Sequence, residues 1–331
     1  MLSLVCLFVG SSGMTLPRAV AALFGHGTNA EVRIVRSVRI PRLLAALIAG
    51  AGLSLSGLIM QTTLGNSMAS PSTLGVSNAA VFGANVSIIA FSGGYLAAGN
   101  DLASYGAGVS PFAVSVSAFL FSAISVFIIL ALCRLRSFTP GVVVLAGIAI
   151  GAVWTAGTNV LQFYATDVGL SAAVIWSFGD LGRATYETDL IMLVSVLAGA
   201  LTFGAMSWRY NALLSGDTAA RSMGVNVDAL RFSSLLLASL ITGVCVSFLG
   251  VIGFVGIICP HITKKLLGSD HRVSIPVSAL TGSILLLAAD ALSRLIGRGS
   301  ALPVGAVTSL LGAPFFFYII FTREEHGHAH G

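Results

Sequence analysis

The chain has 331 residues, of which 56% are hydrophobic and only 9% are charged, and its mean hydropathy is +0.96. Soluble proteins carry about 25% charged residues, so this composition excludes a soluble globular domain. The formal net charge of +5 comes from 15 arginines and 2 lysines against 12 acidic residues. The positions of these charges along the chain are therefore more informative than their sum.

The composition predicts an all-α polytopic membrane protein. A membrane helix needs roughly 20 mainly apolar residues, so the chain has room for about ten transmembrane helices. The 38 glycines suit a helical bundle, because small residues let helix backbones approach closely. The apolar runs are continuous rather than alternating, which disfavours a β-barrel. Four cysteines lie far apart without metal-ligand spacing, and we interpret them as packing residues: Cys6, Cys133, Cys245 and Cys259.

The first apolar segment, residues 1–12, is short. At 1.5 Å per residue it covers about 18 Å of a hydrocarbon core about 30 Å thick. It has no basic n-region and no clear cleavage site, so we prefer a clipped first span to a signal peptide. Residues 17–42 follow as a predicted polar connection with a basic cluster of Arg33, Arg36, Arg39 and Arg42.

The remaining apolar segments predict a single transmembrane domain over residues 1–331. The predicted spans are residues 43–63, 74–91, 111–132, 141–164, 190–207, 232–249, 252–266, 275–296 and 305–321. With residues 1–12 they make about ten, and an even number places both termini on one side, which we take as cytoplasmic. Nine basic residues then lie inside and eight outside, a weak positive-inside bias. The arginines outside predict an acidic extracytoplasmic partner, because guanidinium groups pair with carboxylates bidentately.

One polar segment, SWRYNALLSGDTAARSMGVNVDALR over residues 207–231, differs from its apolar surroundings. Gly216 and Gly224 divide it into two short helical pieces, and Asp217 is placed to cap the second. The segment is longer than a simple turn between membrane helices requires. We interpret it as a docking surface for a soluble partner, with a solvated connection as the alternative.

Motifs for catalysis are absent from the sequence. There is no GxxxxGK[ST] phosphate loop, no HExxH zinc signature and no Ser/His/Asp set, so we predict neither an enzyme nor a metal site. Asp290 is the clearest acidic residue inside a span, and the scarcity of such residues disfavours ion-coupled transport. The tail of residues 324–331 is predicted to be disordered; its histidines offer at most a weak metal site.

Several polar residues within the spans have both a structural and a functional interpretation. Asp290 and Arg294 are spaced i,i+4 on one helix, which favours an ion pair. Three polar side chains either join helices or line a translocation path: Asn85, Asn159 and Gln162. Pro260–His261 indicates a helix kink, with contact to a cytoplasmic partner as the alternative.

Four stretches together resemble the FecCD/BtuC-like permeases of ABC importers. They are VRIPRLLAALIAGAGLSLSGLIMQTTLGNSMASPSTLGVSNAA (residues 38–80), SGDTAARSMGVNVDALR (215–231), LGVIGFVGIICPHITKKLLGSDHRVSIPVSAL (249–280) and ALPVGAVTSLLGAPFFFYIIF (301–321). This family imports iron–siderophores, haem and cobalamin. The chain departs from the family in its short first span, in the loop Asn66–Pro71, which lacks the usual first proline, and in residues 175–189.

The resemblance implies a type II ABC importer permease with ten helices. Its partners would be two ABC ATPase subunits, which carry the ATP and Mg²⁺, a periplasmic or lipid-anchored substrate-binding protein, and a second permease copy or paralogue. The chain itself would bind no cofactor and no nucleic acid. It would lie among the lipids of a bacterial or archaeal cytoplasmic membrane as a multi-pass protein.

The resemblance also implies roles for particular residues. Arg39 and Arg42 of the RxPR motif, with Arg294, would meet acidic side chains of the binding protein. The coupling helices, at about residues 211–228, would fit a cleft on the ATPase through a larger set: Leu213, Leu214, Ser215, Gly216, Asp217, Ala220, Arg221, Met223, Gly224 and Val225.

We therefore predict a permease subunit that imports a chelated iron compound, with an iron–siderophore as the preferred cargo. A haem, cobalamin or molybdate importer of the same fold is the alternative, and an ion-coupled secondary transporter is the alternative of another class.

Overall fold

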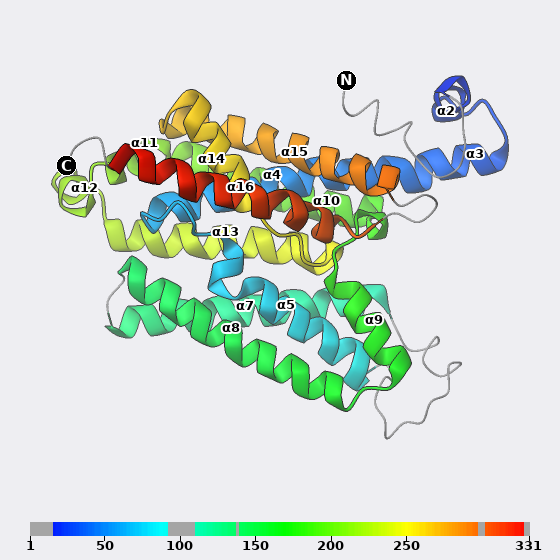
Figure 1. The fold of residues 1–331 in the computed structure, drawn as a ribbon, viewed down its shortest axis with the longest axis horizontal. Helices are drawn as coiled ribbons and strands as arrows, with labels where there is room; N and C mark the ends of the chain where they lie inside the picture. Colours follow the sequence, from blue (N-terminus) through cyan, green and yellow to red (C-terminus); the bar gives the residue numbers. More distant parts are fainter. Residues whose placement is uncertain (1–15, 92–109, 137–138, 297–301, 328–331) are drawn as a thin grey trace.

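The computed structural model describes residues 16–91, 110–136, 139–296 and 302–327. All regular elements in these ranges are helices, packed side by side into an elongated bundle (Figure 1). They are α2 (Leu16–Leu23), α3 (Asn29–Ile34), η1 (Val35–Arg39), α4 (Ile40–Thr63), η2 (Pro71–Leu74), α5 (Val76–Asn85), η3 (Val86–Phe91), α7 (Pro111–Arg136), α8 (Pro140–Phe163), α9 (Asp167–Ser177), η5 (Leu181–Arg183), α10 (Tyr186–Ala205), α11 (Ser207–Leu213), α12 (Asp217–Ser222), α13 (Val227–Leu249), α14 (Val255–Leu267), α15 (His271–Ile296) and α16 (Val304–Gly327).

Six helical segments in these ranges are long and apolar enough to cross a membrane. They are Asn29–Thr63, Pro111–Leu135, Pro140–Phe163, Tyr186–Ala205, Val227–Leu249 and His271–Ile296. Shorter apolar helices add Val76–Phe91, Asp167–Ser177 and Val304–Phe315. Each predicted span within the described residues coincides with a helix, so the all-α polytopic fold is confirmed. The predicted first span, residues 1–12, lies outside the described residues, as do the last residues of the histidine tail.

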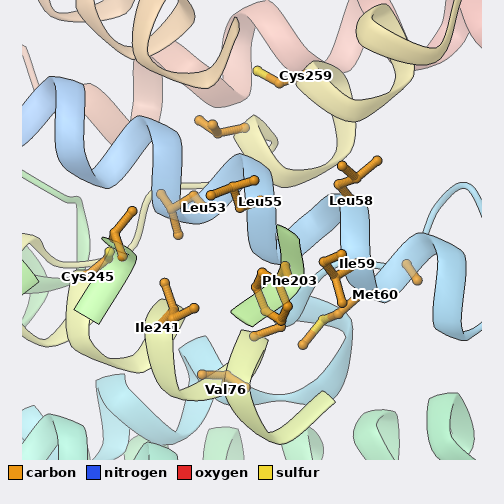
Figure 2. Packing of buried hydrophobic residues seen from close by; sticks show 14 of the residues in the cluster. Leu53, Leu55, Leu58, Ile59, Met60, Val76, Phe203, Ile241, Cys245 and Cys259 are labelled. Atoms are coloured by element: carbon orange, nitrogen blue, oxygen red, sulfur yellow. The ribbon is translucent and has the colours of Figure 1, made fainter. Parts of the chain in front are cut away.

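The helix α4 is the most deeply buried of the long helices and lies between α15, α13, α14 and α10. Figure 2 shows its Leu55, Leu58 and Ile59 among buried side chains of the neighbouring helices, including Phe203 of α10 and Ile241 of α13. Most side chains of α4 are buried, so this helix forms the centre of the bundle and runs from one of its ends to the other.

Glycines allow the closest helix contacts of α4. A Cβ at Gly50 would collide with the backbone of Gly282 in α15, and a Cβ at Gly57 would collide with the backbone of Gly256 in α14. Next to the first of these contacts, the hydroxyl of Ser54 donates to the carbonyl of Ser278 at 2.7 Å. Close backbone approach and interhelical hydrogen bonds hold membrane helices together where lipid supplies no hydrophobic force. The close packing predicted for the glycines of this segment is thus confirmed.

The helices α5, α7, α8 and α9 form the other side of the bundle, drawn in the lower part of Figure 1. The helix α13 joins the two sides, since it packs on both α4 and α7. The rings of Phe82, Phe121 and Trp154 pack together at centroid distances of 5.0–5.7 Å and connect α5, α7 and α8. The described cysteines, Cys133, Cys245 and Cys259, are buried and unbridged, as expected for packing residues.

One connection in the sequence-based prediction is wrong, and one helix was not predicted. Residues 17–42, expected to be a polar connection, form α2 and α3, and the latter continues through η1 into α4. Thr28 and Glu31 start α3 with a capping box, which gives the polar sequence a helical start. The stretch between the fifth and sixth predicted spans likewise contains a helix, α9, capped by Thr166. In α3 a local capping box stabilises a helix within a polar stretch, whereas α9 is apolar but shorter than a full span.

Candidate functional site

The polar segment between α10 and α13 lies at one end of the bundle, opposite to α2 and α3 (Figure 1). It forms two short helices, α11 and α12, as predicted. Gly216 and Gly224 adopt φ angles of 95° and 83°, which glycine reaches without strain, and they bracket α12. The expectation that Asp217 caps α12 is wrong: Gly216 holds the cap position, and the Asp217 carboxylate is bound to Arg231.

The predicted coupling residues divide into an outward and an inward set. The outward set carries exposed apolar side chains, with Leu214 49% and Met223 51% exposed. The other exposed members are Ser215, Gly216, Arg221 and Gly224, while Asp217 is half-buried. The inward set consists of Leu213, Ala220 and Val225, which join the hydrophobic core. The segment therefore has one face fixed on the bundle and one face open to a partner.

Two open grooves lie on this segment, one beside α12 and one between α11 and the start of α13. The larger one, of about 460 Å³, is lined by Cys133, Arg134, Thr139, Asp217, Arg221, Asp228 and Arg231. The other, of about 360 Å³, is lined by Met206, Trp208, Arg209, Gly224, Val225, Asn226, Ala229, Leu230 and Ser233. Together with the exposed Leu214 and Met223, the grooves give this end of the molecule an uneven surface on which another protein can dock.

Two ion pairs on this segment differ in their surroundings. Arg231 is nearly buried and binds both carboxylate oxygens of Asp217 at 2.8 Å. Arg221 binds Asp228 at 3.0 Å, but both side chains are 54% exposed. Exposed pairs contribute about 0–1 kcal/mol, whereas a buried bidentate pair also fixes geometry. The first pair therefore determines where α12 lies.

A second polar cluster anchors α11. The buried hydroxyl of Tyr210 lies 2.8 Å from that of Ser234, and burial raises the pKa of Tyr210 to about 12. Asn211 accepts from the backbone N–H of His271 at 2.8 Å and donates to Asp270 at 2.7 Å. Hydrogen bonds from the Arg272 backbone and from Asn211 lower the pKa of Asp270.

The three predicted docking arginines lie at the opposite end and are nearly buried. Asp290, 1% exposed, accepts from Arg42 Nε and Arg294 Nη2, each at 2.7 Å. The predicted i,i+4 pair of Asp290 with Arg294 is confirmed, and Arg42 is an additional partner. Arg39 is only 7% exposed, and Arg42 also lies 3.8 Å from Asp180. The exposed cations at this end include Arg33 and Arg36 instead.

Sequence reasoning missed Asp189, a second buried acidic residue. It lies in the first turn of α10 and is 3% exposed, and neither carboxylate oxygen has a hydrogen-bond partner within the described residues. The sequence-based boundary placed it just outside the sixth span, in a polar connection. Only the packing of α10 on its neighbours shows that this carboxyl is enclosed.

The three residues predicted for a path are not equivalent. Asn85 is fully buried and accepts from Gln162 at 3.1 Å, which joins α5 to α8. Asn159 is exposed on α8, one turn after the exposed Thr155. The amide of Asn78, which the sequence analysis did not single out, donates to Thr155 at 3.2 Å. Exposed polar groups on a membrane helix face a protein partner or water rather than lipid.

Among the described residues, no group of three or more His, Cys, Asp or Glu side chains is arranged to hold a metal ion. The polar groups at both ends instead connect helices and offer exposed surface. Such an arrangement suits mechanical movement and protein docking.

Comparison with known proteins agrees with this architecture. The model of the FecCD transport family matches residues 1–322. A putative ABC transporter permease of Methanocaldococcus jannaschii is 43% identical over 96% of this chain and 90% of its own length. The hemin transport system permease of Yersinia pestis is 35% identical over 97% and 94%. A solved inward-facing structure of a putative metal-chelate type ABC transporter superposes with a TM-score of 0.81 at 25% identity, covering 97% of this chain and 95% of that one. Because the family model spans nearly the whole sequence, the chain belongs to the FecCD transport family.

Proposed function

We propose that the chain is the permease subunit of an ATP-driven importer of a chelated iron compound, and an iron–siderophore is the preferred candidate for this cargo. The observation that carries the proposal is the segment α11–α12, whose inner face is fixed on the bundle by a buried ion pair while Leu214 and Met223 remain exposed. Two partner ABC ATPase subunits bind ATP and Mg²⁺ and hydrolyse the nucleotide. The chain moves in response, without a catalytic role or a cofactor of its own.

The movement is a rocking of two permease subunits, a second copy or a paralogue completing the path. Nucleotide binding draws the coupling segments together at the cytoplasmic face, and the cavity between the subunits opens first to one side and then to the other. In this proposal the chain lies in the cytoplasmic membrane of a bacterium or an archaeon, with the α2–α3 end outside.

The translocation path follows the polar strip of Asn78, Thr155 and Asn159. These side chains are exposed in helices that are otherwise apolar. Asn85 and Gln162 bond to each other and support this wall from behind. In a variant without its native cysteines, Asn159→Cys is expected to react with a membrane-impermeant maleimide during transport, whereas Asn85→Cys is expected to be protected.

The binding protein docks on the outer end, where acidic side chains meet arginines. Because Asp290 already holds Arg42 and Arg294, a docking carboxylate meets the exposed Arg33 and Arg36 first and must compete with Asp290 for the buried pair. Exposed ion pairs contribute about 0.2–1 kcal/mol each, so several act together to set register and speed association.

Haem, cobalamin and other chelated metals remain the alternative cargoes, since the similar proteins include a hemin transport permease and a putative metal-chelate type transporter. Uptake assays with each labelled compound, in liposomes that hold the complete transporter, distinguish these cargoes. A molybdate importer of the same fold is tested in the same assay.

The ATPase assignment is tested by substituting the open face. Leu214→Glu with Met223→Glu is expected to abolish co-purification of a P-loop ATPase from native membranes. Phe24→Glu, a matched change at an apolar side chain that is 72% exposed at the opposite end, should leave co-purification intact. If no P-loop subunit accompanies the unaltered chain, or if liposomes holding this chain alone move cargo down an ion gradient, the chain is a secondary transporter and the proposal is wrong.

The docking assignment has a separate test. Replacing Arg39 and Arg42 by Glu is expected to weaken capture of the binding protein while the ATPases still co-purify. Equal loss of both partners would contradict the assigned roles of the two ends.

A further inference from the structure

Among the contacts of the inward face of the coupling segment, two polar anchors converge on the last turn of α4. In the first, Asp217 of α12 reaches α4 through Arg231 of α13. In the second, Asn211 of α11 reaches α4 through His271 of α15. Both reach neighbouring residues, Thr63 and Thr62, although the partners come from three different parts of the sequence.

The first anchor is the guanidinium group of Arg231. It binds both oxygens of Asp217 at 2.8 Å, and its Nε donates to the carbonyl oxygen of Thr63 at 2.8 Å. This carbonyl is one of the last four of α4, and the carbonyls in the last turn of a helix receive no hydrogen bond from an N–H group of the same helix. The planar guanidinium offers five donors in a fixed geometry, so one side chain ties α12 to α4. The side chain is 7% exposed, which shields these contacts from competing water.

The second anchor is the imidazole ring of His271, at the start of α15. Its Nδ1 lies 2.9 Å from Asn211 Oδ1, and its Nε2 lies 2.7 Å from the hydroxyl of Thr62. The Asn211 amide also donates to Asp270, which fixes its oxygen toward His271. The ring nitrogen Nδ1 is therefore the donor in its contact, and α11 is tied to α4 through a buried ring.

We propose that these anchors make α4 the element that transmits movement of the coupling segment across the membrane, and that Arg231 and Asn211 are positioning residues for this coupling. The inference rests on the proposed function of α11–α12. The helix α4 has 24 residues, about 36 Å at 1.5 Å per residue, with its only proline at the outer end. The helices α14, α15 and α16 each contain an internal proline. At its outer end α4 carries Arg42, which is bound to Asp290 of α15.

The test measures movement at the outer end and needs no cargo. Spin labels are placed at Val38, in η1 directly before the outer end of α4, and at Phe163, the last residue of α8; these side chains are 52% and 79% exposed. The complete transporter is reconstituted in liposomes and trapped with ATP and vanadate, and the distance between the labels is measured with and without nucleotide. The unaltered chain is expected to show a change in this distance.

Arg231→Gln is expected to retain the ATPase subunits and their hydrolysis but to lose most of the distance change. The exchange Asp217→Arg with Arg231→Asp restores the ion pair but not the bond to Thr63, so it should retain ATPase binding and still lack the outer movement. Because these changes affect buried groups, Thr62→Val provides a milder, nearly isosteric test, with a smaller distance change expected.

A distance change like that of the unaltered chain in Arg231→Gln, in the charge exchange or in Thr62→Val would overturn the inference while leaving the proposed function intact. Failure of the unaltered chain to bind any ATPase would instead overturn the proposed function. A loss of ATPase binding in the charge exchange would also count against the inference, because it would show that Arg231 only stabilises the position of α12.

Discussion

Replacing Asp290 by Asn is the perturbation with the clearest energetic consequence. Asp290 is 1% exposed and receives hydrogen bonds from two guanidinium groups, each at 2.7 Å. The Asn side chain keeps one oxygen for one arginine but presents an NH₂ group to the other. At least one charge-assisted hydrogen bond is lost, which costs about 1.5–3 kcal/mol. Arg42 and Arg294, 13% and 11% exposed, also lose the charge of Asp290, and Arg42 retains only the more distant Asp180 at 3.8 Å.

Removing one partner of a buried ion pair costs about 3–5 kcal/mol in total. Because both arginines retain slight exposure, we expect Asp290→Asn to lower the free energy of unfolding by about 3 kcal/mol, at the lower end of that range. Reversible unfolding in mixed detergent micelles, followed by far-UV circular dichroism, measures this change.

Asp189→Asn is the matched control. Asp189 is similarly buried, at 3% exposure, but has no hydrogen-bond partner within the described residues. An unpaired buried charge is unfavourable, so its removal should change the free energy of unfolding by less than about 1 kcal/mol or stabilise the protein. If Asp290→Asn destabilises no more than Asp189→Asn, the buried network does not hold α4 to α15 and the reasoning fails.

Two further predictions concern packing and pH. Gly57→Ala would push a Cβ into the backbone of Gly256 and should lower the free energy of unfolding by about 1–3 kcal/mol through overpacking. Gly204→Ala, with open space around it, should have little effect or stabilise α10 by up to about 1 kcal/mol. Chemical unfolding of both variants measures these changes, and equal effects would contradict the close approach of α4 and α14. Burial raises the pKa of Tyr210 to about 12, above its usual value of about 10. The unfolded chain therefore loses this proton first, and the corresponding stability is present below about pH 10 and is lost as the pH rises toward 12. Tyr210→Phe should lower the free energy of unfolding by about 1 kcal/mol at neutral pH, because the hydrogen bond to Ser234 is removed. Above about pH 10 the stability of this variant should decline less steeply than that of the unaltered chain. An unchanged decline at alkaline pH would exclude Tyr210 as its source.

The sequence by itself determined the features that depend on short stretches of chain. Long apolar runs predict membrane helices, since every backbone polar group in lipid needs a partner within the helix. The polar break after residue 207 and its two glycines predict the short helices α11 and α12. The i,i+4 spacing of Asp290 and Arg294 predicts their ion pair. All these features require only knowledge of neighbours within a few turns.

The hydropathy-based prediction was wrong where a local capping interaction starts a helix in a polar stretch. The capping box of Thr28 and Glu31 starts a helix in a stretch that is too polar to register as a span. Asp217 is likewise a residue type that often caps helices, but its carboxylate binds Arg231, 14 residues later in the chain. A bidentate bond to a guanidinium group is stronger than a bond to one backbone N–H, and only the fold places that group within reach.

The tertiary structure alone decided which charges are buried and what they bind. Arg42 and Asp290 are 248 residues apart, and Arg231 and Thr63 are 168 apart, so no local pattern connects them. Packing between helices buries Asp189 and the docking arginines, although their sequence neighbourhoods suggest solvent. Burial depends on which helices meet, and helix contacts are set by side-chain and glycine surfaces distributed over the whole chain.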